Sequence, residues 1–341
     1  MRPQGCQETR LQEKARTISC NSHISNQFLA QRALTLPKTQ TYTHLMTGRR
    51  ILGATVVLLT VVLLHTPALR AQTLQRSIYV SVLNEAGAPV PDLGPSDFAV
   101  REDNLSREIL KVGPVETPLS VALMVDTSAA GRNNVRDIRE AAIEFIKGVT
   151  GTDIKHQVAL IGVGERPTVL VDYTSDQARL LKGIGLIYSH DQSGAYLLDG
   201  VIEASKGFKK REAQRAVIVS IATRGPEYSN RYHDQVETAL KDAGASFHIV
   251  MIGPPPTDVT SNEGRERAIT FDTATADTGG RYDNVLAASA LPDRLKQVAT
   301  ELTHQYLVTY ARPQMLIPPE KITITAKRTD LTVRGTPVKS K

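Results

Sequence analysis

The chain has 341 residues, of which 41% are hydrophobic and 22% charged, with two cysteines and no tryptophan. This composition is typical of a globular protein with one large domain and some appendages. The formal net charge of +6 comes from the first 71 residues, and the remainder is close to neutral. We therefore expect no nucleic-acid-binding surface in the body of the protein. Both cysteines, Cys6 and Cys20, also precede that body, which excludes a disulfide framework or thiolate metal site there.

Residues 46–71 have the pattern of a secretory signal peptide. Arg49 and Arg50 form a short positive region before the uncharged apolar run Ile51–Leu64. The small residues of Ala68-Leu69-Arg70-Ala71 then supply a cleavage site. The run is shorter than the roughly 20 residues that cross a bilayer comfortably. We predict an exported protein, periplasmic or extracellular. The alternative is an uncleaved leader that anchors the chain and is its only membrane contact.

The position of this leader bears on the residues before it. A signal peptide normally begins at the initiating methionine, which points to Met46. Residues 1–45 are polar and show no amphipathic period. We predict that they are a disordered or spurious extension.

Residues 77–117 are predicted to begin a small β-unit, completed by strands from the C-terminal segment. Ile78, Val80 and Val82 alternate with residues of the opposite face, which indicates a strand. A turn at 84–87 comes next, and two more short strands are expected at 97–103 and 108–112. Strands this short bury little apolar surface alone, so the unit should dock on the larger domain after it.

Residues 118–310 alternate apolar runs with helical patterns. The runs are typical of strands buried on both faces of a parallel sheet and lie at 119–125, 158–163, 168–173, 216–222 and 246–252. Helices are expected between and after them, at 134–149, 197–208, 232–243 and 291–304. The alternation predicts an α/β fold with a doubly wound, mostly parallel sheet flanked by helices. The polar, proline-containing segment 253–267 is expected to be a loop, and residues 311–341 to form C-terminal strands and a tail.

The first buried run ends in Asp126-Thr127-Ser128-Ala129-Ala130, which resembles the Asp-x-Ser-x-Ser motif of von Willebrand factor A-type domains. Segments 193–199 and 220–225 are similar to that family's second and third motifs, Gly-Thr-x-Leu-Tyr-Asp and Leu-Thr-Asp-Gly. Segment 96–104 is similar to the strand module that precedes the domain in many exported bacterial proteins of this class. The resemblance implies a von Willebrand A-like fold and a metal-ion-dependent adhesion site at the carboxyl ends of the strands, where open α/β sheets collect ligands.

Matched residue by residue, that metal site is degenerate. Asp126 and Ser128 are present, but Ala130, Ala195 and Arg224 stand where the resemblance places Ser, Thr and Asp. Hard cations depend on carboxylate charge and several oxygen ligands. We therefore expect no cofactor, with Mg²⁺ at the two surviving positions as the alternative. Arg224 either pairs with Asp126 in place of the ion or points into solvent.

We predict a non-enzymatic role in protein–protein recognition or adhesion outside the cytoplasm, through the loops at the carboxyl edge of the sheet. The partner-binding face is predicted to contain Asp126, Ser128, Arg132, Asp191, Tyr196, Arg224 and Glu227. One alternative is a scaffold or assembly component that makes its contacts through the β-unit. A third interpretation, a hydrolase, rests on the loop His190-Asp191-Gln192-Ser193. Triad members rarely come from one loop, so we expect Ser193 to be a helix N-cap.

Overall fold

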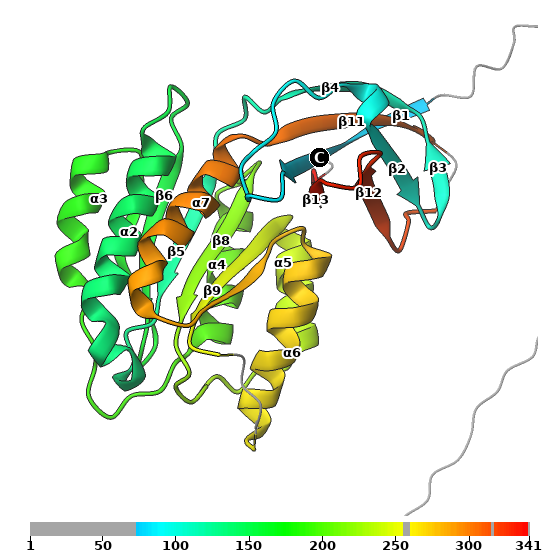
Figure 1. The fold of residues 1–341 in the computed structure, drawn as a ribbon. Coiled ribbons are helices and arrows are strands. Elements are labelled where there is room, and N and C mark those ends of the chain that lie inside the picture. Colours follow the sequence, from blue (N-terminus) through cyan, green and yellow to red (C-terminus); the bar gives the residue numbers. More distant parts are fainter. Residues whose placement is uncertain (1–72, 255–259, 315–316, 340–341) are drawn as a thin grey trace, which may run out of the picture. The chain divides into compact units, whose positions relative to one another are not determined.

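The computed structural model describes residues 73–254, 260–314 and 317–339 (Figure 1). The predicted extension 1–45 and leader 46–71 lie outside these ranges. Within the described ranges, no helix combines the length and the apolar character needed to span a membrane. The described chain forms one six-stranded sheet covered by helices and two smaller antiparallel sheets.

The six-stranded sheet has the order β10-β9-β8-β5-β6-β7. Five of its strands run parallel: β5 (Ser120–Val125), β6 (Gln157–Val163), β8 (Ala216–Ala222), β9 (Ala245–Ile252) and β10 (Tyr282–Val285). The edge strand β7 (Pro167–Thr174) pairs antiparallel with β6. This mostly parallel sheet confirms the predicted fold class.

Helices cover both faces of the sheet, which is why the central strands are continuously apolar. One face packs against α2 (Val135–Thr150), α3 (Gln177–Gly183) and α7 (Leu291–Thr303). The other packs against α4 (Leu197–Lys210), α5 (His233–Ala243) and α6 (Asn262–Asp277). Helices α2 and α7 approach so closely that a Cβ at Gly148 would lie 2.8 Å from the Cβ of Ala299.

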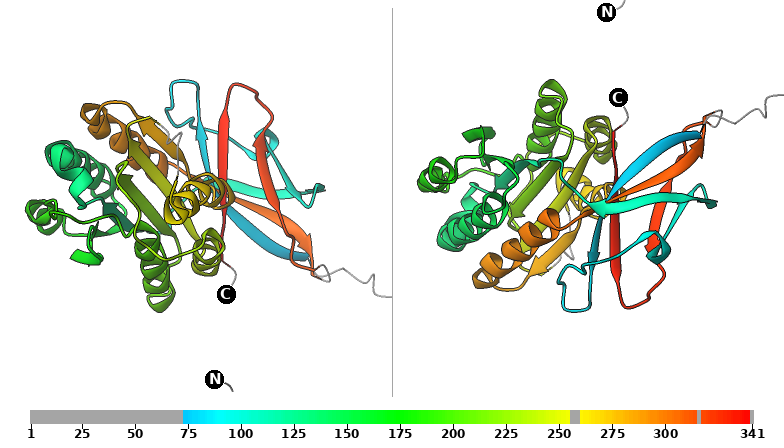
Figure 2. Two further views of the ribbon diagram at one scale, coloured as in Figure 1. Left: turned by 90° about the horizontal axis from the view of Figure 1, so that it is seen from below. Right: turned by 90° about the horizontal axis from the view of Figure 1, so that it is seen from above.

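The β-unit is built from both ends of the described chain, as Figure 2 shows for the blue, cyan, orange and red strands. One sheet, in the order β13-β1-β11-β4, contains β13 (Thr332–Pro337), β1 (Thr73–Leu83), β11 (Tyr306–Pro313) and β4 (Ile109–Pro114). The other, in the order β12-β2-β3, contains β12 (Ile322–Ala326), β2 (Phe98–Glu102) and β3 (Leu105–Arg107). Between them lies a small core that includes Ile78, Phe98, Val308 and Ile324.

Buried polar groups join the β-unit to the domain. Arg215, just before β8, donates to the carbonyl oxygen of Thr117 (3.1 Å) and to Oε1 of Gln305 (2.7 Å). Gln305 in turn donates to Ser81 of β1 (2.9 Å). Because these residues come from the linker, β1 and the start of β11, the guanidinium holds the junction together at the amino-terminal edge of the central sheet.

A carboxylate reinforces the same junction. Glu301 on α7 is buried and lies 3.0 Å from Nη1 of Arg281 and 2.8 Å from Nη2 of Arg334 on β13. A charge removed from water is stabilised only when it is paired and hydrogen-bonded, as this one is. The ion pairs therefore fix β13 against the domain.

Two expectations about individual elements are wrong. Residues 168–173 were expected to be a buried strand, but β7 is an edge strand with Val169 exposed. The expected loop 253–267 contains the start of α6, at Asn262. Positions that α6 buries include Glu266, Arg267 and Thr270, so no apolar stripe marks this part of the helix in the sequence.

Candidate site at the carboxyl edge of the sheet

Asp126 lies at the carboxyl end of β5, and its carboxylate is buried. Its Oδ1 accepts a hydrogen bond from the backbone N–H of Ser128 (2.8 Å). Its Oδ2 accepts one from the N–H of Thr223 (3.1 Å) and a second from the Thr223 hydroxyl. Both oxygens are therefore satisfied by neutral groups of the protein, and the carboxylate ties the loop after β5 to the loop after β8.

The donors around Asp126 do not fit a hard divalent cation. Ser128 Oγ is buried without a hydrogen-bond partner and is a hydroxyl that could face an ion. The adjacent space is filled, because a Cβ at Gly225 would lie 2.5 Å from the Cβ of Ala130. Among the described residues, no three His, Cys, Asp or Glu side chains are grouped to hold a metal. One carboxylate with both oxygens hydrogen-bonded and the two hydroxyls of Ser128 and Thr223 fall short of the octahedral oxygen shell that Mg²⁺ requires.

Arg224 does not pair with Asp126, so that hypothesis is wrong and the alternative holds. The side chain is exposed, and its aliphatic part lies over Gly253, where a Cβ would be 2.8 Å from Arg224 Cδ. Gly253 has a φ of +102°, a backbone conformation that glycine adopts readily. The close approach places the aliphatic part of Arg224 against the backbone of Gly253, directly after β9.

A different arginine is buried near this edge. Arg267 on α6 donates from Nη1 to the carbonyl oxygen of Gly225 (2.7 Å) and lines the same small cavity as Asp126. Sequence reasoning missed it because it falls in the segment expected to be a loop. Ser261 offered a signal, since its hydroxyl accepts from the N–H of Gly264 (3.0 Å) and caps α6.

Glu227, predicted on the face, is turned inward and only 3% exposed. Its Oε1 accepts from the backbone N–H groups of Leu197 (3.0 Å) and Ser229 (3.2 Å), so it occupies the N-terminus of α4. Its Oε2 is buried without a partner. Burial raises the pKa of this carboxyl to about 7, although hydrogen bonds from Ser229 and the charge of Arg267 oppose the rise.

Three of the seven predicted face residues, Asp126, Ser128 and Glu227, are thus buried beneath the loops. Arg132 and Asp191 are exposed and form an ion pair. Tyr196 is half-buried, with its ring 6.1 Å from the ring of Tyr228 in an edge-on contact.

Hydrogen bonds hold the loop between α3 and α4 over the end of β5. The N–H of His190 donates to the carbonyl oxygen of Thr127 (2.8 Å), and the Ser189 hydroxyl donates to that of Ser128 (2.6 Å). The loops after β5 and β8 and the loop before α4 therefore meet at one edge. We call the exposed side chains there the recognition face: Arg132, Tyr188, Asp191, Arg224, Tyr228 and Tyr232. The sequence-based prediction did not include the three tyrosines.

The residues behind the hydrolase interpretation do not form a relay. In this described loop the His190 ring packs against Tyr188, with centroids 4.7 Å apart, and Asp191 pairs with Arg132. The Ser193 hydroxyl donates to the backbone carbonyl of His190 (2.9 Å), so Nε2 of the ring does not activate it. Ser193 is not the N-cap of α4 either, because Tyr196 occupies that position.

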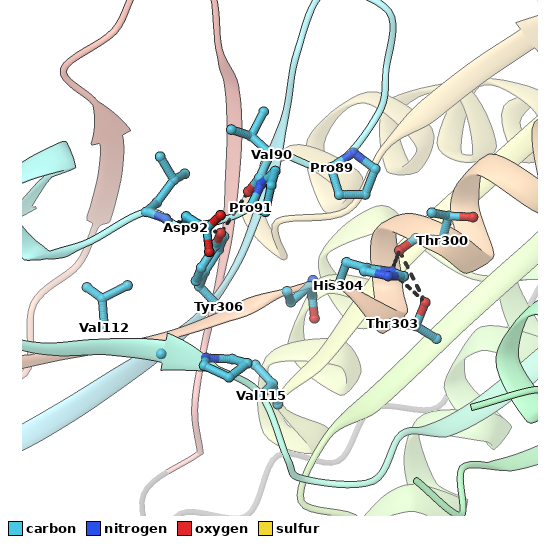
Figure 3. A pocket seen from close by; sticks show the side chains of 14 residues that line it. Pro89, Val90, Pro91, Asp92, Val112, Val115, Thr300, Thr303, His304 and Tyr306 are labelled. Carbon is cyan, nitrogen blue, oxygen red and sulfur yellow. Dashed lines mark hydrogen bonds between the residues drawn. The ribbon is translucent and has the colours of Figure 1, made fainter. Parts of the chain in front are cut away.

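A pocket of about 660 Å³ lies away from this edge, between the β-unit and the end of α7 (Figure 3). Its walls are largely apolar and include Val90, Val112 and Val115. The hydroxyl of Tyr306 donates to the carbonyl oxygen of Val90 (2.7 Å). Nδ1 of His304 lies 2.8 Å from the backbone carbonyl oxygen of Thr300. The Tyr306 hydroxyl and Nδ1 of His304 are thus hydrogen-bonded within the protein, and the exposed Asp92 adds a carboxylate to the mainly apolar lining.

Comparisons with known proteins concern the part of the chain that forms the six-stranded sheet. Residues 121–223 match the family model described as von Willebrand factor type A domain. A search of curated protein sequences found no match.

Among solved structures, the chain is similar to a von Willebrand factor type A protein from Catenulispora acidiphila, with 11% identity and a TM-score of 0.44 over 79% of this chain and 75% of that one. It is also similar to the conserved hypothetical protein BatB from Bacteroides thetaiotaomicron, with 15% identity and a TM-score of 0.41 over 54% and 98%. A third is the vWF domain of the type V pili tip protein Mfa5 from Porphyromonas gingivalis, with 12% identity and a TM-score of 0.41 over 54% and 95%.

Proposed function

The chain contains a von Willebrand factor A-type domain that includes residues 121–223, and from this premise we propose that it recognises another protein through the recognition face, outside the cytoplasm and without a bound metal. The extracytoplasmic setting rests on the predicted leader at residues 46–71.

This proposal rests on the position of the exposed tyrosines. In the described part of the chain, the three tyrosines exposed by half or more are Tyr188 (55%), Tyr228 (51%) and Tyr232 (53%). All three lie at the carboxyl edge of the central sheet, with the exposed Arg132 and Arg224. Tyrosine and arginine dominate the binding energy of protein interfaces, because a large rigid contact area is combined with hydrogen-bonding groups.

The groups beneath the face support the proposal through rigidity. Asp126 joins two loops, and Glu227 holds the loop after β8 against the start of α4. A surface that is already ordered loses less conformational entropy when a partner binds. The buried carboxylates thus serve the face by fixing its shape.

The same contacts favour metal-independent binding. The oxygens of Asp126 are engaged by Ser128 and Thr223, and an exposed arginine stands at the position of the missing carboxylate. Chelation should therefore leave recognition intact, whereas a face completed by Mg²⁺ would lose its partner.

The pocket in Figure 3 favours the runner-up, in which the β-unit makes the contacts. Truncating the β-unit would not separate the two proposals, because the side chains that pack around Arg215 and Glu301 would lose their buried partners. Point substitutions can separate the two proposals, since the recognition face and the pocket share no residue.

The test is capture from a cell-envelope extract of the producing organism on the immobilised protein, with and without EDTA. We expect one partner to be retained in both conditions and lost from the double variant Arg224→Ala/Tyr228→Ala. The matched control is Val112→Ala/Tyr306→Phe in the pocket, which should retain the partner. Loss in that control with retention by the face variant would favour the β-unit, and loss with EDTA alone would contradict metal independence.

A further inference from the structure

The outer end of the β-unit carries exposed aliphatic side chains that neither the core nor the recognition face uses. We propose that this end rests on a lipid surface in a membrane-anchored form of the protein. We call it the apolar tip and define it by Leu74, Leu105, Leu110 and Ile317.

The tip residues are exposed well beyond what the core of the β-unit requires. Leu105 on β3 is 61% exposed and Leu110 on β4 is 42% exposed. Ile317, before β12, is 87% exposed, and Leu74 near the start of β1 is 37% exposed. Single exposed aliphatic residues are common, but several at one end of a small module mark an interaction surface.

Contacts between strands place these residues at the same end. Leu74 is paired with Arg312, whose Nη2 donates to the carbonyl oxygen of Ile317. Nε of Arg312 lies 3.4 Å from Oε2 of Glu102, and Glu102 is the strand partner of Leu105. Leu110 follows Ile109, which pairs with Tyr310 on β11. Figure 1 shows the starts of β1 and β4 and the end of β11 beside β3.

The chain outside the described residues identifies the occupant. The apolar run Ile51–Leu64 ends eight residues before β1 begins at Thr73. Eight residues span at most about 3.3–3.6 Å each, so their total reach is below about 30 Å. A leader retained in a bilayer would therefore keep the start of β1, and with it Leu74, within about that distance of the lipid headgroups. A soluble protein partner would have no comparable tether.

The charges near the tip indicate how it would bind. The exposed cations Arg101 and Lys111 are balanced by the exposed anions Asp103 and Glu108. The contact should therefore rest on shallow insertion of the aliphatic side chains and depend little on anionic lipid.

This arrangement leaves the recognition face free. The strands of the central sheet begin at the junction, where the N–H of Ser120 donates to the carbonyl oxygen of Arg215 (2.9 Å). The parallel strands then run away from the β-unit towards the loops of the recognition face. A protein standing on its apolar tip presents those loops on the side away from the junction, and this inference does not depend on the proposed partner binding.

The test uses the full chain in neutral phosphatidylcholine vesicles, with Cys6→Ser and Cys20→Ser removing the native thiols. A fluorophore is attached through Ser106→Cys at the tip or through Leu286→Cys, an exposed site beyond the end of β10. Nitroxide-labelled lipid should quench the tip label about threefold more than the label at 286, as shallow interfacial insertion requires. Equal quenching at both sites would overturn the proposal.

Two further measurements complete the test. The double variant Leu105→Ser/Ile317→Ser should lose most of the tip quenching, whereas Val169→Ser, which changes an exposed residue of β7, should not. Unchanged quenching in the double variant would show that the leader alone positions the label. The mass of the protein from the producing cell should include the leader, and processing after Ala71 would remove the tether and overturn the inference. None of these readouts uses the protein partner, so capture by the recognition face can fail independently.

Discussion

Two buried glutamates, at opposite edges of the central sheet, are held in different ways. Glu301, at the junction with the β-unit, is 1% exposed and lies between Arg281 and Arg334. Glu227, under the recognition face, is 3% exposed, and its Oε1 accepts from the backbone N–H groups of Leu197 and Ser229. Burial alone would raise the pKa of both. At Glu301 the charge of Arg334 and its neighbours outweighs burial and lowers the pKa, whereas at Glu227 burial prevails.

The comparison separates a junction held by buried ion pairs from a surface whose supporting carboxylates are held by hydrogen bonds. At the junction, the buried carboxylate of Glu301 is paired with two guanidinium groups, and these ion pairs join the β-unit to the domain. Beneath the face, the carboxylates of Asp126 and Glu227 accept hydrogen bonds from neutral donors, and the buried Arg267 donates to a backbone carbonyl. The predicted effect of a substitution therefore depends on which edge it changes.

Glu301→Ala should have the largest effect. It leaves Arg281 and Arg334 without their shared carboxylate, and removing one partner of a buried ion pair typically costs about 3–5 kcal/mol. The free energy of unfolding, measured by urea denaturation, should fall by about this amount. Glu140→Ala breaks an exposed ion pair with Arg136 on α2 and should cost about 0.5 kcal/mol or less. Similar losses in the two variants would show that the joint is no stronger than a surface pair.

Asp126→Ala should cost about 2 kcal/mol, because it leaves the buried donors of Ser128 and Thr223 without an acceptor. Asp153→Ala, at an exposed position, is the control and should be neutral. Adding Mg²⁺ should change the melting temperature of neither the native protein nor the variant, since only ligands that bind the folded state stabilise it. An increase with Mg²⁺ that is abolished by Asp126→Ala would restore a metal site.

Glu227→Gln should change the pH dependence of stability. In the folded protein Glu227 keeps its proton up to a pKa of about 7, whereas the unfolded chain releases it near 4.5. The folded state binds more protons in this window, so the contribution of Glu227 to stability falls as pH rises from 4.5 to 7. The variant should match the native protein at pH 4.5 and exceed it by up to about 3 kcal/mol at pH 8, since the pKa rises from 4.5 to about 7 and one pKa unit corresponds to about 1.4 kcal/mol. Glu203→Gln on the exposed side of α4 should show no such difference.

Arg132→Ala should have the smallest effect on stability. Arg132 and Asp191 are both exposed, and an exposed ion pair contributes about 0–1 kcal/mol. Its effect should appear instead as weaker capture of the protein partner, in the assay used for Tyr228. A stability loss as large as that of Asp126→Ala would place Arg132 in the framework and remove it from the face.

The architecture could be predicted from the sequence because the central strands are continuously apolar and most of the helices between them are amphipathic. The runs at 119–125 and 216–222 coincide with β5 and β8 to within one residue. Helix α6 was missed because it buries Glu266 and Arg267, which pattern-based reasoning places in solvent. Strand β7 was misjudged because an apolar run does not reveal whether a strand lies at an edge.

The site was predicted less completely. The position of Asp126 at the end of its strand follows from the sequence, but its hydrogen bonds to Thr223 depend on how two distant loops meet. Glu227 was expected on the surface because a lone acidic residue in a loop normally faces water. Its capping of α4, 30 residues earlier in the chain, is visible only in three dimensions.

Strand β1 lies between β11 and β13, so its two neighbours come from the last part of the chain. The hydroxyls of Ser77 and Thr309, 3.0 Å apart, are separated by 232 positions. Such distant pairings are slow to form, because a long loop must close before any contact is gained. Whether the chain emerges from a ribosome or from a translocation channel, β1 has neither of its partners in the sheet until nearly the whole protein has followed it. The β-unit can therefore be completed only late, after nearly the whole chain has emerged.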